Sequence, residues 1–81
     1  MGANAPARRG PYNSAMNLII NGSGRAFTEP LTIVDLLERL EMTGKRVAVE
    51  RNGSIVPRSL HAQTLLTDGD ILEIVVAVGG G

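Results

Sequence analysis

The segment "LTDGDILEIVVAV", residues 66–78, decides the fold of this chain. A turn signal at 67–70 leads into an apolar run that is interrupted only by Glu73. A strand that is apolar on both faces is typical of the middle of a sheet, where neither face meets water. We therefore predict that residues 71–78 form a central strand. Three glycines, residues 79–81, follow this strand without a linker.

Shorter apolar segments upstream are predicted to complete the sheet. Asn52-Gly53 is the strongest short signal for a β-hairpin, because both residues accept the positive φ of a type I′ turn. Asn21-Gly22 is a second turn signal between two such segments. Residues 58–66 fit either a short helical turn or a loop. The expected strands cover residues 16–21, 24–28, 46–51 and 54–56.

The segment "TIVDLLERLEM", residues 32–42, is predicted to form the one helix. Thr32 is placed to cap its first turn, and Asp35 stands three residues later, where the acid of a capping box belongs. Gly44 is placed to end the helix. The apolar stripe has the helical spacing i, i+3, i+4, i+7 and consists of Ile33, Leu36, Leu37 and Leu40.

The order of these elements, ββαβββ, predicts an α+β domain with a mixed sheet of four to five strands and one helix packed across one face. We expect the domain to cover residues 16–78, with a flexible glycine tail at 79–81. Residues 1–15 contain little to bury and have the composition of a disordered leader or a vector remnant. Met16 then stands at the start of the folded part.

The alternation of side chains along each strand predicts two faces of the sheet. The face under the helix should carry Leu18, Ile20, Val47, Val49, Leu72, Ile74 and Val76. The opposite face should carry Ile19, Ala48, Ile71, Val75 and Ala77. An uncovered apolar patch on so small a protein marks a possible partner surface. Scattered exposed aliphatic side chains are the alternative, and the sequence gives the two interpretations equal weight.

Composition excludes several functions. The chain has no cysteine, which excludes disulfides, thiolate nucleophiles and cysteine metal sites. Residues 16–81 hold six basic and eight acidic side chains, and the whole chain has two aromatic residues. Neither the charge nor the aromatic content suits nucleic acid. No apolar run is long enough to span a membrane, and no secretory signal is present, so we expect a cytoplasmic protein.

No combination of residues forms a catalytic constellation. His61 is the one histidine, and we expect it to be a surface loop residue. Asp68 and Asp70 flank a turn glycine but lack the further ligands of a calcium loop. Arg51 and Arg58 bracket a hairpin and are expected to point to solvent. The remaining candidate is the terminal carboxylate of the glycine tail, for which a frayed chain end is the alternative.

The motifs "NGSIVPR" (52–58), "LTDGDILEIV" (66–75) and the terminal "GGG", together with the ββαβββ order, resemble the ubiquitin-like sulfur carriers of thiamine biosynthesis, the ThiS family. The resemblance covers residues 16–81 and implies a β-grasp fold. It also implies a protein co-substrate rather than an enzyme, with no cofactor bound to the chain itself.

The resemblance implies that a partner adenylyltransferase uses ATP and magnesium to convert the carboxylate of Gly81 to an acyl-adenylate. Sulfur from a donor such as a cysteine desulfurase then gives a thiocarboxylate, which thiazole synthase accepts. Gly79 and Gly80 thread the tail into the partner. With no cysteine, the chain has no side chain that holds a persulfide, so the C-terminus is where sulfur would be carried.

Three alternatives stay open from the sequence. The small subunit of molybdopterin synthase has the same fold, tail and thiocarboxylate, but delivers sulfur to a pterin precursor. A ubiquitin-like modifier would be joined to target lysines through Gly81. A β-grasp binding module with an inert tail would keep its function after deletion of Gly80 and Gly81, whereas a carrier would lose it.

Overall fold

The computed structural model describes residues 14–77, and these residues form five strands, one α-helix and a short 3-10 helix. In chain order the elements are β1 (Ala15–Ile20), β2 (Ser23–Thr28), α1 (Ile33–Arg39), β3 (Val47–Arg51), β4 (Ser54–Val56), η3 (Arg58–Leu60) and β5 (Ile71–Val76). The ββαβββ order is therefore confirmed. The segment 58–66, for which a helical turn or a loop was expected, contains η3 and connecting turns.

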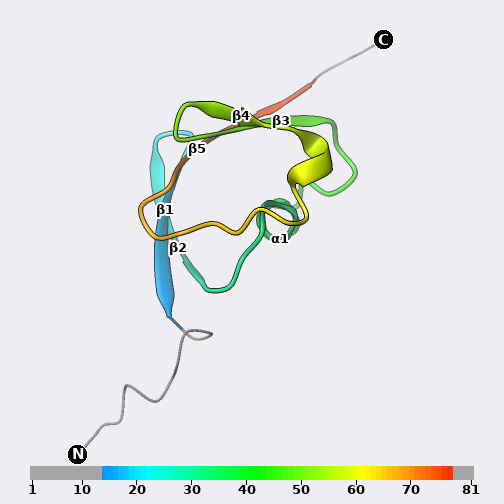
Figure 1. The fold of residues 1–81 in the computed structure, drawn as a ribbon. Helices are drawn as coiled ribbons and strands as arrows, with labels where there is room; N and C mark the ends of the chain where they lie inside the picture. The colour runs from blue at the N-terminus through cyan, green and yellow to red at the C-terminus, as the bar shows by residue number, and fades with distance from the viewer. Residues whose placement is uncertain (1–13, 78–81) are drawn as a thin grey trace, which may run out of the picture.

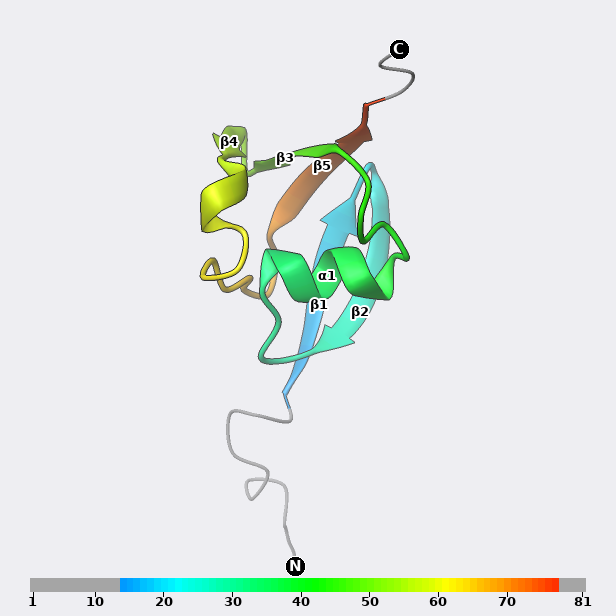
Figure 2. The ribbon, with the colours of Figure 1, turned by 90° about the vertical axis from the view of Figure 1, so that its right-hand side faces the viewer.

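The five strands form one mixed sheet in the order β2-β1-β5-β3-β4. β5 is central, as predicted, and it is parallel to β1 and antiparallel to β3. Figure 2 shows α1 lying across one face of this sheet, in front of β1 and β2. In Figure 1 the chain passes from β4 through η3 and a long connection before it enters β5 in the middle of the sheet. The predicted α+β class and single covering helix are confirmed.

Both tight hairpins have the predicted turn chemistry. Asn21 and Gly22 join β1 to β2 with φ values of 50° and 86°. Asn52 and Gly53 join β3 to β4 with φ values of 51° and 89°. Asparagine tolerates this left-handed region better than most residues, and glycine has no Cβ to clash there. Two positive φ values in a two-residue loop match the right-handed twist of the flanking strands.

The first turn of α1 carries the predicted capping box. The Thr32 hydroxyl accepts a hydrogen bond from the Asp35 N–H at 3.0 Å, and the Asp35 carboxylate accepts one from the Thr32 N–H at 3.0 Å. Two backbone donors that the helix leaves unpaired are satisfied in this way.

The predicted end of the helix is wrong. α1 ends at Arg39, with Leu40 as its C-cap, and not at Gly44. Glu41 takes the left-handed conformation with a φ of 60°. Its N–H donates to the Glu38 carbonyl at 3.0 Å, and the Met42 N–H donates to the Leu37 carbonyl at 2.8 Å. This pair of bonds is a Schellman motif with glutamate where glycine is usual.

The core lies between α1 and the sheet, and the predicted division of faces is confirmed. Leu18, Val49 and Leu72 are fully buried, while Val47 and Val76 at the sheet end are half-buried. The buried apolar cluster consists of Met16, Leu18, Ile20, Leu31, Ile33, Leu36, Leu37, Val49, Leu66, Leu72 and Ile74.

The folded part begins earlier than the sequence suggested. Ala15 pairs with Thr28 in the β1–β2 ladder, and the Ser14 carbonyl accepts a hydrogen bond from the Glu29 N–H at 2.9 Å. The partner strand β2 therefore extends the ladder beyond Met16, which pairs with Phe27. The rest of the expected leader lies outside the described residues. At the other end, β5 stops at Val76, two residues before the predicted boundary.

Candidate functional site

The end of β5 is where the chain leaves the sheet. β5 is paired with β1 at Ile71 and Leu72 and with β3 from Leu72 to Val76, so its start is held on both edges and its end is held by β3. The last backbone bond here is donated by the Ala77 N–H to the Arg46 carbonyl at 2.8 Å. The predicted thiocarboxylate residue Gly81 and the threading residues Gly79 and Gly80 lie outside the described residues. Their roles remain predictions.

The face of the sheet away from α1 is not covered by any element within residues 14–77. We call it the uncovered face and define it by Ile19, Ala48, Ile55, Ile71, Val75 and Ala77, all of which are exposed. Ile71 and Val75 keep 49% and 62% of their surface exposed, which is high for aliphatic side chains on a central strand. Five of the six were predicted to share this face from strand alternation.

Ile55 is the member that the sequence analysis missed, and it keeps 68% of its surface exposed, more than Ile19, Ile71 or Val75. It pairs with Glu50 across the β3–β4 hairpin. The register of a two-residue Asn-Gly hairpin follows from the turn itself, so pairing outward from Asn52 and Gly53 would have placed it.

A shallow hollow of about 320 Å³ lies beside the end of β5. It is lined by Arg46, Val47, Ala48, Arg58, Val75 and Ala77. Two arginines therefore line the hollow beside the point where the chain leaves the sheet, and Arg58 is exposed, as predicted. We call Arg46 and Arg58 the basic end of the uncovered face.

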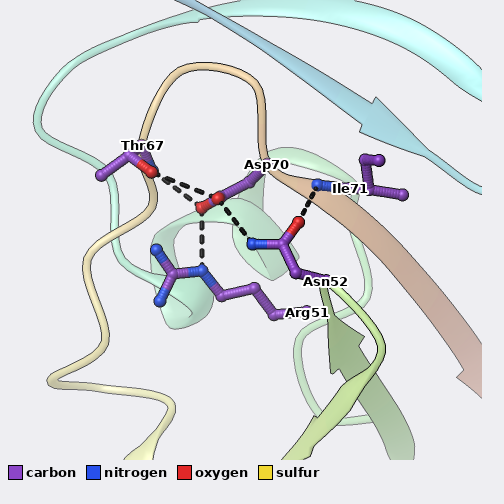
Figure 3. Close-up of polar contacts among 5 residues, drawn as sticks. All are labelled: Arg51, Asn52, Thr67, Asp70 and Ile71. Carbon is purple, nitrogen blue, oxygen red and sulfur yellow. Dashed lines mark hydrogen bonds and ion pairs between the residues drawn. The ribbon is translucent and has the colours of Figure 1, made fainter.

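A buried carboxylate fixes the start of β5 (Figure 3). Asp70 is 4% exposed, and its Oδ2 accepts hydrogen bonds from Arg51 Nε at 2.8 Å and from the Thr67 N–H at 2.9 Å. Its Oδ1 accepts from Asn52 Nδ2 at 3.0 Å and from the Thr67 hydroxyl at 3.1 Å. The prediction that Arg51 points to solvent is wrong, because its guanidinium forms an ion pair with Asp70.

This environment lowers the pKa of Asp70 below its ordinary value. Burial alone raises the pKa, because it disfavours the charged form. The hydrogen bonds from Thr67 and Asn52, and the hydrogen bond and charge of Arg51, together outweigh burial and hold the carboxylate ionised.

Asparagine side chains extend the pairing of β5 on both edges. Asn21 Oδ1 accepts from the Ile74 N–H at 2.8 Å, and its Nδ2 donates to the Ile74 carbonyl at 3.1 Å. On the other edge, Asn52 Oδ1 accepts from the Ile71 N–H at 2.9 Å. The two turn asparagines therefore also act as short strand partners, which anchors the central strand where β1 and β3 end.

The "DGD" turn also contacts β1. The Asp68 carboxylate accepts from the Asn17 N–H at 2.7 Å, and the Gly69 N–H donates to the Asn17 carbonyl at 2.7 Å. Gly69 has a φ of 90°, which a residue with a Cβ rarely adopts. The turn is thus a structural joint between β1 and β5.

His61 is not the surface residue that was expected. It is 5% exposed, and its Nε2 lies 3.0 Å from the Val56 carbonyl. A carbonyl only accepts, so Nε2 carries the proton and donates. The Val34 N–H donates to the His61 carbonyl at 3.2 Å, which ties η3 to α1. His61 therefore has a packing role.

Within residues 14–77, no group of three or more metal-ligating side chains comes together. Among the same residues, no helix is long and apolar enough to cross a membrane.

Comparisons with known proteins agree with this geometry. The sequence model of the ThiS family matches residues 18–81. The crystal structure of the thiamine biosynthesis protein ThiS from Geobacter metallireducens superposes with a TM-score of 0.70 at 35% identity, covering 82% of this chain and 100% of that one.

Two curated relatives carry informative names. The sulfur carrier protein ThiS of Bacillus subtilis is 44% identical over 50 residues, which is 62% of this chain and 76% of that protein. A thiazole synthase of Paramagnetospirillum magneticum is 50% identical over 66 residues, or 82% of this chain. The chain spans only 20% of the length of that thiazole synthase.

The β-grasp sheet with one covering helix, and a central strand that leads toward a glycine tail, define the class of ubiquitin-like carrier proteins. The chain belongs to the ThiS family. The resemblance stated from the motifs is therefore confirmed, together with the β-grasp fold that it implied. The family consists of sulfur carriers and not of enzymes.

Proposed function

We propose that this chain is a sulfur carrier of thiamine biosynthesis and that it carries sulfur on the carboxylate of Gly81. The observation that carries the proposal is the position of β5. The start of this strand is held on both edges, its end is paired with β3, and the sequence continues from it to residues 79–81. A tail of glycines has no side chains to obstruct a narrow channel, and its rigid base fixes where the carboxylate is presented. The chain contains no cysteine, which leaves the terminal carboxylate as the place for sulfur.

The chemistry requires activation, because a carboxylate is a poor electrophile. We propose that a partner adenylyltransferase binds ATP and magnesium. The Gly81 carboxylate oxygen attacks the α-phosphate, pyrophosphate leaves, and an acyl-adenylate forms. The terminal persulfide sulfur of a donor such as a cysteine desulfurase attacks the acyl carbon, AMP leaves, and an acyl disulfide to the donor forms. A thiol reductant then cleaves the S–S bond, the donor leaves as its thiol, and a thiocarboxylate remains on the tail. This chain contributes the carboxylate, and the partners supply the catalytic groups.

Thiazole synthase is the proposed acceptor of the sulfur. The name of the Paramagnetospirillum relative supports this destination over a pterin, because a thiazole synthase there includes a region 50% identical to this chain. The uncovered face is the proposed docking surface, since two of its apolar residues, Ile71 and Val75, lie on the strand that leads to the tail. A cytoplasmic location follows from partners of this kind and stays part of the proposal.

Intact mass spectrometry tests the proposal. The full chain is incubated with an adenylyltransferase of this pathway, ATP, magnesium and sulfide. We expect a mass gain equal to replacement of one oxygen by sulfur, and no gain in a chain that lacks Gly81. Circular dichroism of the shortened chain checks that the fold is intact. If the chain gains no mass while the same enzyme modifies another carrier, the remaining interpretation is a β-grasp binding module with an inert tail.

A further inference from the structure

Two carboxylates stand directly opposite each other in the middle of the uncovered face. Glu50 of β3 is the register partner of Glu73 of β5, and both side chains are exposed. Side chains paired in this way have Cβ atoms roughly 4.5–5.5 Å apart, and like charges in such a pair destabilise a sheet. The sheet does not need charged side chains at these two positions, because neighbouring positions on the same face carry apolar side chains.

No basic side chain within residues 14–77 forms an ion pair with either glutamate. The ion pair found in this part of the chain joins Arg51 to Asp70, on the core side of β3. Arg46 precedes β3 and lies four residues before Glu50, beside Ala77. The repulsion between the two glutamates is therefore not relieved by an ion pair inside this domain.

Apolar side chains surround the acidic pair. Ile71 and Val75 flank Glu73 along β5, Ala48 precedes Glu50 on the same face of β3, and Ile55 lies across from Glu50 on β4. A partner that covers these apolar side chains would remove water from the two carboxylates as well. Burying two unpaired carboxylates is costly, so a partner must bring a positive charge to this point.

We propose that the uncovered face docks on thiazole synthase and that a lysine or arginine of the synthase binds between Glu50 and Glu73. The proposal rests on the proposed function and names the contact that would fix the orientation of the carrier. Thiazole synthase is chosen as the occupant because a protein of that name includes a region half identical to this chain within one polypeptide.

The test measures binding of the full chain to the thiazole synthase of the same organism by isothermal titration calorimetry. Glu73→Lys reverses one charge of the pair, and Glu38→Lys makes the same change on the exposed side of α1 as a matched control. We expect Glu73→Lys to weaken binding by about tenfold or more, because one partner of a desolvated charge contact is replaced by a like charge. We expect the control to bind within about twofold of the wild type, since a charge outside the interface has little effect.

A second readout separates docking from folding. Glu73→Lys places opposite charges across β3 and β5, so its urea midpoint should equal or exceed that of the wild type. Weaker binding without loss of stability then reports on the interface.

Binding of Glu73→Lys within about threefold of the wild type would overturn the proposal, because the face would then not contact a basic group. A wild-type chain that becomes thiocarboxylated but binds only the adenylyltransferase, or only a second copy of itself, would overturn the choice of occupant. A chain that gains no sulfur mass would instead refute the proposed function. Binding is measured in the same samples, so a failure of sulfur transfer is distinguished from a failure of docking.

Discussion

The buried carboxylate of Asp70 gives the sharpest prediction about stability. Its two oxygens accept four hydrogen bonds, from Arg51, Asn52 and twice from Thr67. Asp70→Asn preserves the shape of the side chain but removes its charge and turns one oxygen into a donor. The least costly placement puts the amide nitrogen at the Oδ1 position, where the Thr67 hydroxyl can turn to accept. The Asn52 amide then faces another donor.

The loss of unfolding free energy in Asp70→Asn is the sum of two effects. The hydrogen bond from Asn52 is lost, and the bonds from Arg51 and Thr67 become bonds to a neutral oxygen. Hydrogen bonds to charged groups are worth about 1.5–3 kcal/mol and neutral ones about 1 kcal/mol. The Arg51 side chain keeps 28% of its surface exposed, so water recovers part of its interaction. We expect a loss of about 2–4 kcal/mol, a large share of the roughly 5 kcal/mol typical of a small domain.

Urea unfolding followed by circular dichroism measures this loss. Asp68→Asn is the matched control, because Asp68 lies in the same turn but is exposed, and its Oδ1 still accepts from Asn17 after the change. We expect the control to lose less than about 1 kcal/mol. If Asp70→Asn costs no more than the control, the network in Figure 3 does not hold the start of β5 in place.

Three further predictions concern the same stability. Because the pKa of Asp70 is lowered in the folded chain, its carboxylate contributes fully to the free energy of unfolding above the ordinary aspartate pKa of about 3.9. This contribution is lost as the pH falls through the lower pKa of the folded chain. Acid titration of the wild type should therefore show a destabilisation that Asp70→Asn lacks. Leu37→Ala should cost about 2–5 kcal/mol in urea unfolding, because Leu37 is 8% exposed in the core; an unchanged midpoint would contradict the assigned core. Glu41→Gly should raise the unfolding free energy by about 1 kcal/mol, because glycine removes the cost of the left-handed cap, and a lower midpoint would argue against a Schellman motif there.

The parts of the fold that were predicted correctly depend on local signals. The Thr32–Asp35 capping box is contained within four residues, and each Asn-Gly turn is set by the conformational preferences of two. The two faces of the sheet follow from strand alternation, which any strand obeys. The central place of β5 followed from an apolar pattern on both faces. These signals do not depend on which distant segments meet.

The errors arose where distant contacts decide. Arg51 was expected in solvent, but folding brings Asp70, nineteen residues later, to its guanidinium. His61 is buried because its ring nitrogen and its carbonyl are tied to Val56 and to Val34 of α1, and a single polar residue in a loop gives no sign of that. The helix ends with Glu41 in the left-handed conformation that glycine usually adopts there, and the next residue, Met42, packs against the core.

Some parts of the candidate site could be predicted from the residues themselves, and others could not. Strand alternation placed five residues of the uncovered face, and the hairpin register would have added Ile55. Composition alone showed that side-chain sulfur chemistry was excluded. The proposed role of Gly81, in contrast, rests on the resemblance to a family, since neither burial nor spacing distinguishes a working chain end from an idle one.

The glutamate pair also bears on a problem that any carrier of this kind faces. An apolar face that must stay open for an enzyme is equally open to a second copy of itself. In a symmetric contact between two copies whose two-fold axis passes through the middle of this face, Glu50 and Glu73 of one copy would be buried against the same acidic pair of the other. That arrangement gathers four carboxylates in a desolvated interface, while a partner with a basic side chain meets no such penalty. The repulsion between the two glutamates is therefore explained by binding and not by folding. It disfavours self-association and favours a partner that brings a basic side chain to the same residues.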